Sequence, residues 1–125
     1  NKKHKKNQKD DENSTYDQLI GNTPIIHLKI LSRLIGSDIY VKMESANPAG
    51  TGKDRAVKYM LNAAKKHPNY KSGVDIVEGT SGSTGIALAF QCNALGLKLH
   101  VVLPDDQAEE KKCLLEKLAS VTIVP

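Results

Sequence analysis

Apolar residues along this chain recur at two alternating spacings. A spacing of three to four residues, typical of amphipathic helices, predicts helices from Lys53 to about Lys66, over residues 83–95, and from Asp105 or Asp106 through Leu118. Short β-branched and aliphatic stretches over residues 38–44, 74–78, 98–103 and 121–124 are typical of strands. The order β-α-β-α-β-α-β predicts an α/β fold with a parallel sheet, right-handed crossovers and helices on both faces.

The first residues lack this pattern. Up to about Asp17 the chain is mostly Lys, Asn, Asp, Glu and Gln, which offer too little apolar surface to offset the entropy of ordering. We therefore predict a disordered tail over residues 1–18 and one folded part over residues 19–125. The tail also holds much of the positive charge, because five of its first ten residues are lysines. Acidic residues follow them without an aromatic platform, so we expect no nucleic-acid partner.

The remaining composition narrows the class of protein. At 39% hydrophobic and 26% charged residues, the chain suits a globular domain, and its apolar stretches are too short to span a membrane. Cys92 and Cys113 do not form a disulfide framework or a metal-binding pair, which favours a reducing intracellular setting, cytoplasmic or mitochondrial. The four histidines have no spacing suited to a metal.

The first candidate loop is glycine-rich and precedes a predicted helix. Residues 47–55 read Asn-Pro-Ala-Gly-Thr-Gly-Lys-Asp-Arg, which departs from a phosphate-binding P-loop at Asn47 and Asp54. Lys53 places a cation in the first helical turn, where the macrodipole disfavours it. One interpretation is a solvent-facing lysine balanced by Asp54. The other is an amine that loses its proton and forms a Schiff base with a carbonyl.

The second candidate loop joins a predicted strand to a predicted helix. Residues 78–85 read Glu-Gly-Thr-Ser-Gly-Ser-Thr-Gly, which does not match the dinucleotide pattern Gly-x-Gly-x-x-Gly. Its glycines let the backbone approach a ligand, and its hydroxyls and helix amides suit a small carboxylate or phosphate. The alternative is an ordinary helix start capped by Ser83 or Thr84.

Three motifs together resemble a known family. Residues 20–24, 47–55 and 80–85 are similar, in order and spacing, to the cysteine synthase and cystathionine β-synthase family of pyridoxal-phosphate enzymes. The resemblance covers residues 19–125 and implies the fold-type II architecture of the tryptophan synthase β type. It also implies that Lys53 holds pyridoxal 5'-phosphate and that a hydroxyl loop grips the substrate carboxylate: Thr80, Ser81, Ser83 and Thr84. Most members carry Asn at position 83, where the side chain contacts the cofactor, and the shorter Ser83 resembles a fungal-type branch.

The resemblance implies β-replacement at an O-activated serine to make cysteine, with sulfide or a thiol as second substrate. Lys53 would serve as cofactor anchor and general base. Alternatives are a cystathionine β-synthase or serine dehydratase-type lyase, and a non-catalytic fragment or pseudoenzyme. In the family, a phosphate-binding loop and a contact to the pyridine nitrogen follow the region that ends here at Pro125. We therefore expect an N-terminal fragment without its C-terminal domain, inactive alone and a homodimer when full length.

Overall fold

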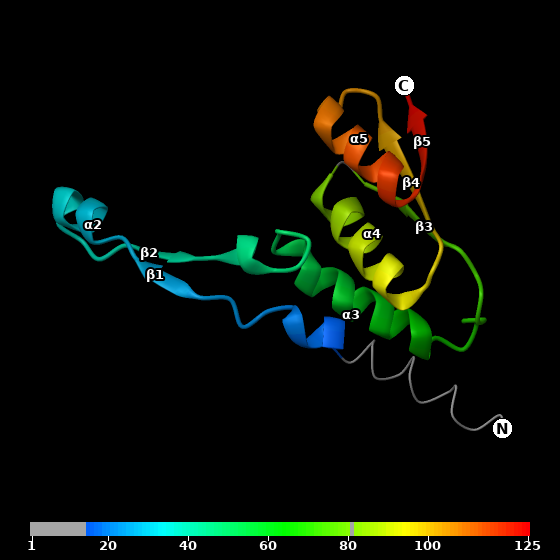
Figure 1. The fold of residues 1–125 in the computed structure, drawn as a ribbon, viewed down its shortest axis with the longest axis horizontal. Helices are drawn as coiled ribbons and strands as arrows, with labels where there is room; N and C mark the ends of the chain where they lie inside the picture. Colours follow the sequence, from blue (N-terminus) through cyan, green and yellow to red (C-terminus); the bar gives the residue numbers. More distant parts are fainter. Residues whose placement is uncertain (1–14, 81) are drawn as a thin grey trace.

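The computed structural model describes residues 15–80 and 82–125 of the chain. Figure 1 shows an extended arm beside a packed body. The arm consists of β1 (Ile25–His27), α2 (Lys29–Ile35) and β2 (Tyr40–Lys42), and it leads into the short 3-10 helix η1 (Glu44–Ala46). The body consists of α3 (Lys53–Lys66), β3 (Ile76–Gly79), α4 (Ser83–Leu95), β4 (Leu99–Pro104), α5 (Glu109–Leu118) and β5 (Ser120–Val124).

The body contains a parallel sheet of three strands in the order β3-β4-β5. Ile76 pairs with Leu99, and Val101 pairs with Val121, so the central strand β4 is bonded on both sides. Each pair of strands is separated in sequence by one helix, as parallel pairing requires. The predicted α/β class and parallel sheet are confirmed.

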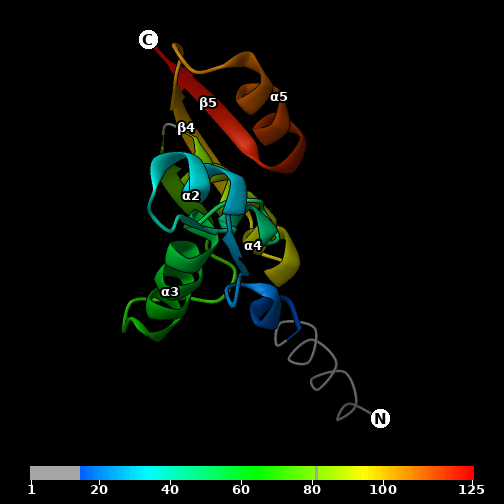
Figure 2. The same ribbon diagram turned by 90° about the vertical axis from the view of Figure 1, so that its left-hand side faces the viewer.

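The arm corrects one part of this prediction. The strand expected over residues 38–44 is β2, and it pairs antiparallel with β1, Ile25 facing Lys42, instead of joining the parallel sheet. Strand β2 pairs with a strand close to it in sequence because the short connection through α2 reverses the chain direction. A chain reversal of this kind gives antiparallel pairing, whereas parallel pairing needs a longer crossover. The sequence pattern predicted neither β1 nor α2. Figure 2 looks along the arm, with α2 in front of the body.

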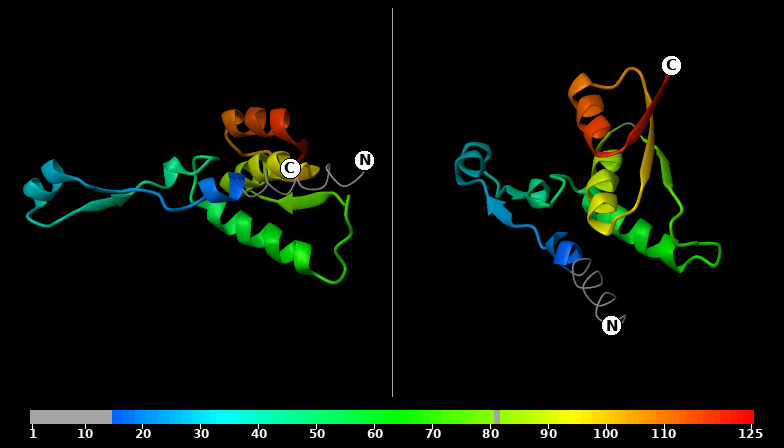
Figure 3. Two further views of the ribbon diagram at one scale, coloured as in Figure 1. Left: turned by 60° about the horizontal axis from the view of Figure 1, so that its bottom comes forward. Right: turned by 45° about the vertical axis from the view of Figure 1, so that its right-hand side comes forward.

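The core lies between the sheet and its helices. Alternate residues of β4 are buried: Leu99, Val101 and Leu103. Helices α4 and α5 both cover the face of the sheet on which these three residues lie (Figure 3). On the opposite face Val77 is 63% exposed. Helix α4 is apolar around much of its circumference and packs between α3 and α5, as a buried helix must. Burial raises the pKa of its Cys92 thiol to about 11, which suits a packing residue.

Two predicted boundaries are wrong. Helix α5 begins at Glu109 with Ala108 before it, and neither Asp105 nor Asp106 caps it. The reason is that the Asp105 N–H donates to the Val124 carbonyl at 2.9 Å, which extends the β4–β5 pairing past the predicted helix start.

At the other end, residues 15–19 are helical, so ordered chain begins before residue 19. The Asp17 carbonyl accepts a hydrogen bond from Lys58 Nζ at 2.7 Å, which holds this turn on α3. The rest of the predicted tail, residues 1–14, lies outside the described residues. None of the helices in the described ranges is long and apolar enough to cross a membrane.

Candidate active site

Lys53 is the first residue of α3, as predicted. Gly52 precedes it without a side-chain cap, and the Lys53 N–H donates to Thr51 Oγ1 at 3.2 Å. The side chain is exposed, and within the described residues its ammonium group makes no hydrogen bond or ion pair. The amine is therefore available to a ligand.

Lys53 faces solvent, as one interpretation predicted, but Asp54 does not pair with it. The Asp54 side chain is fully buried and turns back toward the loop, where it accepts the N–H groups of Ala49 at 3.1 Å and Thr51 at 3.4 Å. Burial raises the pKa of the Asp54 carboxyl, although these two backbone donors oppose the shift. Asp54 thus fixes the shape of the loop that leads to Lys53.

Asn47 organises the same loop from its other end. The residue is 4% exposed, and its Nδ2 donates to the Thr51 carbonyl and to Glu44 Oε2, each at 2.9 Å. Its Oδ1 accepts the Gly21 N–H at 2.8 Å, which joins the first family-like motif to the second. Buried side-chain amides in folded proteins almost always have hydrogen-bond partners. Those of Asn47 all belong to the chain itself, so the residue has a structural role in the loop.

An ion pair beside the loop was missed by the sequence analysis. Arg55 Nε donates to Glu44 Oε2 at 2.9 Å and Arg55 Nη2 to Glu44 Oε1 at 3.0 Å, a bidentate arrangement. Thr23 Oγ1 donates to Glu44 Oε1 at 2.7 Å. Hydrogen bonds from Arg55 and then Thr23 lower the pKa of Glu44 to about 2. The sequence did contain a signal for this ion pair. Arg55 is a second cation in the first turn of α3, where the helix dipole disfavours positive charge unless an acidic partner is near.

The second loop starts helix α4 without the predicted side-chain cap. Gly82 occupies the N-cap position, and neither Ser83 nor Thr84 bonds a backbone N–H there, so the capping interpretation is wrong. Within the described residues the Ser83 and Thr84 hydroxyls have no hydrogen-bond partner. Thr80 is held by its N–H bond to the Val102 carbonyl, at 3.0 Å. Ser81 lies outside the described residues.

Glycine is required at two positions of this loop. A Cβ on Gly85 would lie 2.7 Å from Thr80 Cγ2, closer than real Cβ contacts. Gly82 has a φ of +156°, and a Cβ there would lie 3.1 Å from Lys111 Nζ of α5. Gly85 and Gly82 are therefore required by packing against Thr80 and Lys111 of this chain and, at Gly82, by the backbone conformation.

The two loops belong to helices that pack together. Gln91 of α4 is buried, and its Nε2 donates to the Asp54 carbonyl in the first turn of α3 at 2.9 Å. Among the described residues, however, no hydrogen bond joins Lys53 to Thr80, Ser83 or Thr84. Packed helices therefore support both loops, and no described residue bonds the side-chain amine of Lys53 or the hydroxyls of Ser83 and Thr84.

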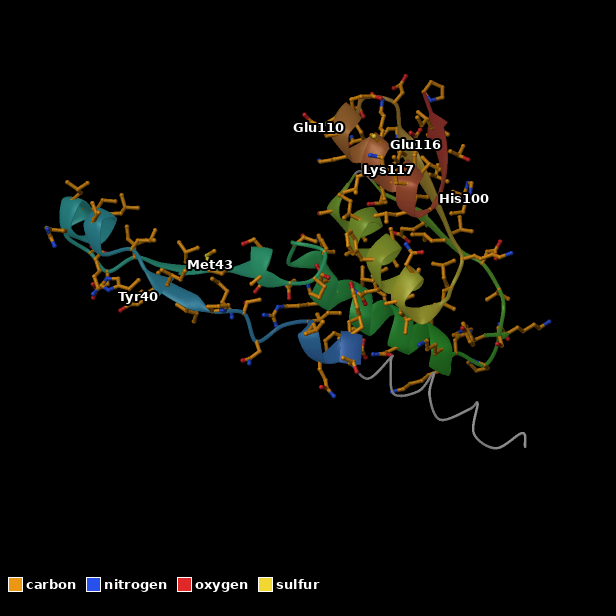
Figure 4. The ribbon with its side chains drawn as sticks, in the orientation of Figure 1. Tyr40, Met43, His100, Glu110, Glu116 and Lys117 are labelled. Carbon is orange, nitrogen blue, oxygen red and sulfur yellow. The ribbon has the colours of Figure 1, made fainter. Side chains whose placement is uncertain are left out.

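Two other clusters of polar side chains do not form sites. A hollow lined in part by His100, Glu116 and Lys117 (Figure 4) lies at the amino ends of β4 and β5, whereas ligands of parallel sheets bind at the carboxyl ends. In the arm, Ser32 and Asp38 both contact Nε2 of His27 at 3.2 Å, so the imidazole cannot relay a proton between them as in a hydrolase triad. Within the described residues, no group of three His, Cys, Asp or Glu side chains could hold a metal ion.

The fold and the lysine-bearing loop define a class of protein. The chain belongs to the pyridoxal-phosphate dependent enzyme family, whose sequence pattern matches residues 16–124. The residues present suit that cofactor, because the Lys53 amine is exposed and has no partner among the described residues. The loop before it is held by hydrogen bonds among its own polar groups.

Particular relatives fall among the cysteine synthases. The chain is 46% identical over 109 residues to cysteine synthase 1 of Emericella nidulans, covering 86% of this chain and 30% of that protein. It is 44% identical over 106 residues to a Saccharomyces cerevisiae protein with "mitochondrial cysteine synthase" in its name, covering 83% of this chain and 27% of that protein. A solved structure, a hydrogen sulfide-producing enzyme from Fusobacterium nucleatum, matches with a TM-score of 0.80 and 35% identity over 87% of this chain and 36% of that chain. The chain thus spans about a third of each relative's length.

Proposed function

We propose that this chain supplies the lysine and the carboxylate-binding loop of a pyridoxal-phosphate dependent β-replacement enzyme of the cysteine synthase type. The observation that carries the proposal is the Lys53 amine at the start of α3, which is exposed and has no partner among the described residues. The loop before it is held in shape by Asn47 and Asp54. Cysteine synthases among the relatives support the choice of reaction.

Lys53 has two roles in this proposal. Its amine anchors the cofactor covalently, and when released it accepts and returns the proton at the substrate Cα. Pyridoxal phosphate, when bound, supplies the electron sink that stabilises the resulting carbanion. The loop around Asn47 and Asp54 fixes the helix start, so the amine acts from a defined position.

The loop over residues 80–84 binds the carboxylate of an O-activated serine substrate. The amino end of α4 presents backbone N–H groups with no side-chain cap, and Ser83 and Thr84 add hydroxyls. Ser83 also faces the cofactor in this proposal, and sulfide or a thiol is the second substrate. We extend the proposal to an intracellular homodimer, cytoplasmic or mitochondrial. The name of the Saccharomyces cerevisiae relative supports the mitochondrial location.

Covalent trapping tests the role of Lys53. Its amine condenses with the aldehyde of pyridoxal phosphate and releases water, and borohydride then reduces the C=N bond to a stable amine. Peptide mapping should find the label on Lys53 in preference to Lys58, whose ammonium is engaged by the Asp17 carbonyl. Lys53→Arg should abolish this label and Lys58→Arg should leave it. Preferential labelling of any other lysine would contradict the proposal.

A second experiment tests the role of the loop. Thr84→Ala should weaken substrate binding, measured as the spectral response to O-acetylserine, and leave cofactor labelling of Lys53 unchanged. Thr122→Ala is a suitable control, because Thr122 lies on β5 and its hydroxyl contacts His100 at 2.8 Å. Loss of cofactor labelling with an unchanged substrate response would assign the loop to the cofactor instead.

A further inference from the structure

The cluster formed by Thr23, Glu44 and Arg55 joins three separate parts of the chain. Thr23 lies two residues before β1, Glu44 lies two residues after β2, and Arg55 is the third residue of α3. The three side chains close a ring of hydrogen bonds, because Arg55 Nη2 also donates to Thr23 Oγ1 at 3.2 Å. The cluster therefore ties both ends of the arm to the helix turn that carries Lys53.

Neighbouring groups reinforce this attachment. The Met43 N–H donates to the Pro24 carbonyl at 2.9 Å, which closes the base of the arm beside the cluster. Gly21 has a φ of +91°, and a Cβ there would lie 2.9 Å from Arg55 Nη1, so the guanidinium packs directly over this glycine. The position of Arg55 is thus restricted by packing as well as by charge.

Ordinary surface ion pairs contribute little to stability. Here the side chains are partly exposed, 41% for Arg55 and 29% for Glu44. Several features distinguish the pair: the bidentate geometry, the shared Thr23 hydroxyl, and the bond from Asn47 Nδ2 to the same Glu44 carboxylate at 2.9 Å. Asn47 in turn bonds the Thr51 carbonyl of the lysine loop.

We infer that Arg55 is a positioning residue for Lys53, acting with Glu44 and Thr23 to hold the lysine loop and the first turn of α3 against the base of the arm. The inference rests on the proposed role of Lys53. Arginine is required for this geometry, since lysine cannot donate from two fixed nitrogen atoms in one plane. A shift of about 1 Å in a reacting group is enough to lower a rate by about 100-fold.

The test compares Arg55→Lys and Thr23→Val with two matched controls. Arg33→Lys makes the same substitution at the last turn of α2, and Thr122→Val makes the same substitution on β5. The first readout is hydrogen exchange in the full chain at the loop amides of Thr51 and Asp54, relative to Leu88 in α4. The second is the rate of borohydride trapping of pyridoxal phosphate at Lys53, and urea unfolding reports global stability.

Arg55→Lys should speed exchange of the loop amides relative to Leu88 by about tenfold and slow trapping at Lys53 by a similar factor. Thr23→Val should act in the same direction with a smaller effect, and neither control should change either ratio. If Arg55→Lys speeds exchange at Leu88 as much as at the loop amides, or leaves the trapping rate unchanged, Arg55 is only a stabilising residue. Either result would overturn the inference.

Glu44→Gln provides a milder variant if Arg55→Lys does not fold, because Gln keeps an oxygen acceptor and removes the charge. Loop-amide exchange and trapping at Lys53 then test the inference in this variant. The exchange readout is independent of the cofactor. A wild-type chain that labels another lysine therefore contradicts the proposed function, whereas normal wild-type labelling with no effect of Arg55→Lys contradicts only the inference.

Discussion

The body and the arm differ in how far their apolar side chains are buried. In the body, Val57, Leu88 and Leu115 are at most 2% exposed and pack in one core. In the arm, Ile30 is 76% exposed and Leu34 is 78% exposed, although the local backbone is regular. Apolar burial is the main source of folding free energy, so the body has its own source of stability and the arm depends on its attachment at Thr23, Glu44 and Arg55.

Truncation of a leucine in each region should give the largest contrast. Leu88→Ala removes a core side chain and should lower the free energy of unfolding by about 2–5 kcal/mol. Leu34→Ala should change it by less than about 0.5 kcal/mol, since the side chain is already in water. Urea unfolding followed by circular dichroism measures both. Similar losses for the two variants would mean that the arm is packed in solution.

A glycine in the body should be sensitive for a steric reason. Gly85→Ala places a methyl group 2.7 Å from Thr80 Cγ2, and we expect a loss of about 1–3 kcal/mol in unfolding free energy. Thr80→Ser removes that Cγ2, so the double variant Thr80→Ser, Gly85→Ala should recover part of the loss. Gly36 of the arm has open space around it, and Gly36→Ala tests backbone strain alone at its φ of +77°. No recovery in the double variant would contradict the steric explanation.

The attachment between the two regions should respond to acid. Hydrogen bonds from Arg55 and Thr23 lower the pKa of Glu44 from its ordinary 4.5 to about 2. The unfolded chain therefore binds more protons than the folded chain between these values, and the stability due to Glu44 is lost as the pH falls from 4.5 toward 2. Urea midpoints across this range should fall less steeply for Glu44→Gln than for the wild type. Glu116→Gln, the same substitution at an exposed glutamate of α5, is the matched control for the change in slope.

The sequence predicted the body better than the arm. Helices α3 and α4 have the predicted bounds, because each follows a glycine. Helix α3 buries residues at helical spacing, and α4 is apolar around much of its circumference. The partner of β2 could not be predicted, since alternation along a strand does not say which sheet the strand joins. The proposed site residues, Lys53 and the hydroxyl loop, were predicted from local motifs. The cluster at Arg55 was missed because Thr23 and Arg55 are 32 positions apart and meet only in the fold.

The smallest expected effect on stability comes from the exposed face of α2. Leu34→Ser should alter the free energy of unfolding by no more than about 0.5 kcal/mol, because the side chain makes few contacts to lose. It should nevertheless reduce self-association, since exposed apolar patches drive protein contacts and Ile30, Leu31 and Leu34 together line one hollow of the arm. Sedimentation velocity at several concentrations measures this. Tyr59→Ser is the matched control, because Tyr59 is 73% exposed on α3 in the body. If Tyr59→Ser reduces association as much as Leu34→Ser, the arm does not promote self-association more than the body does. The two regions would then differ only in how far their apolar side chains are buried.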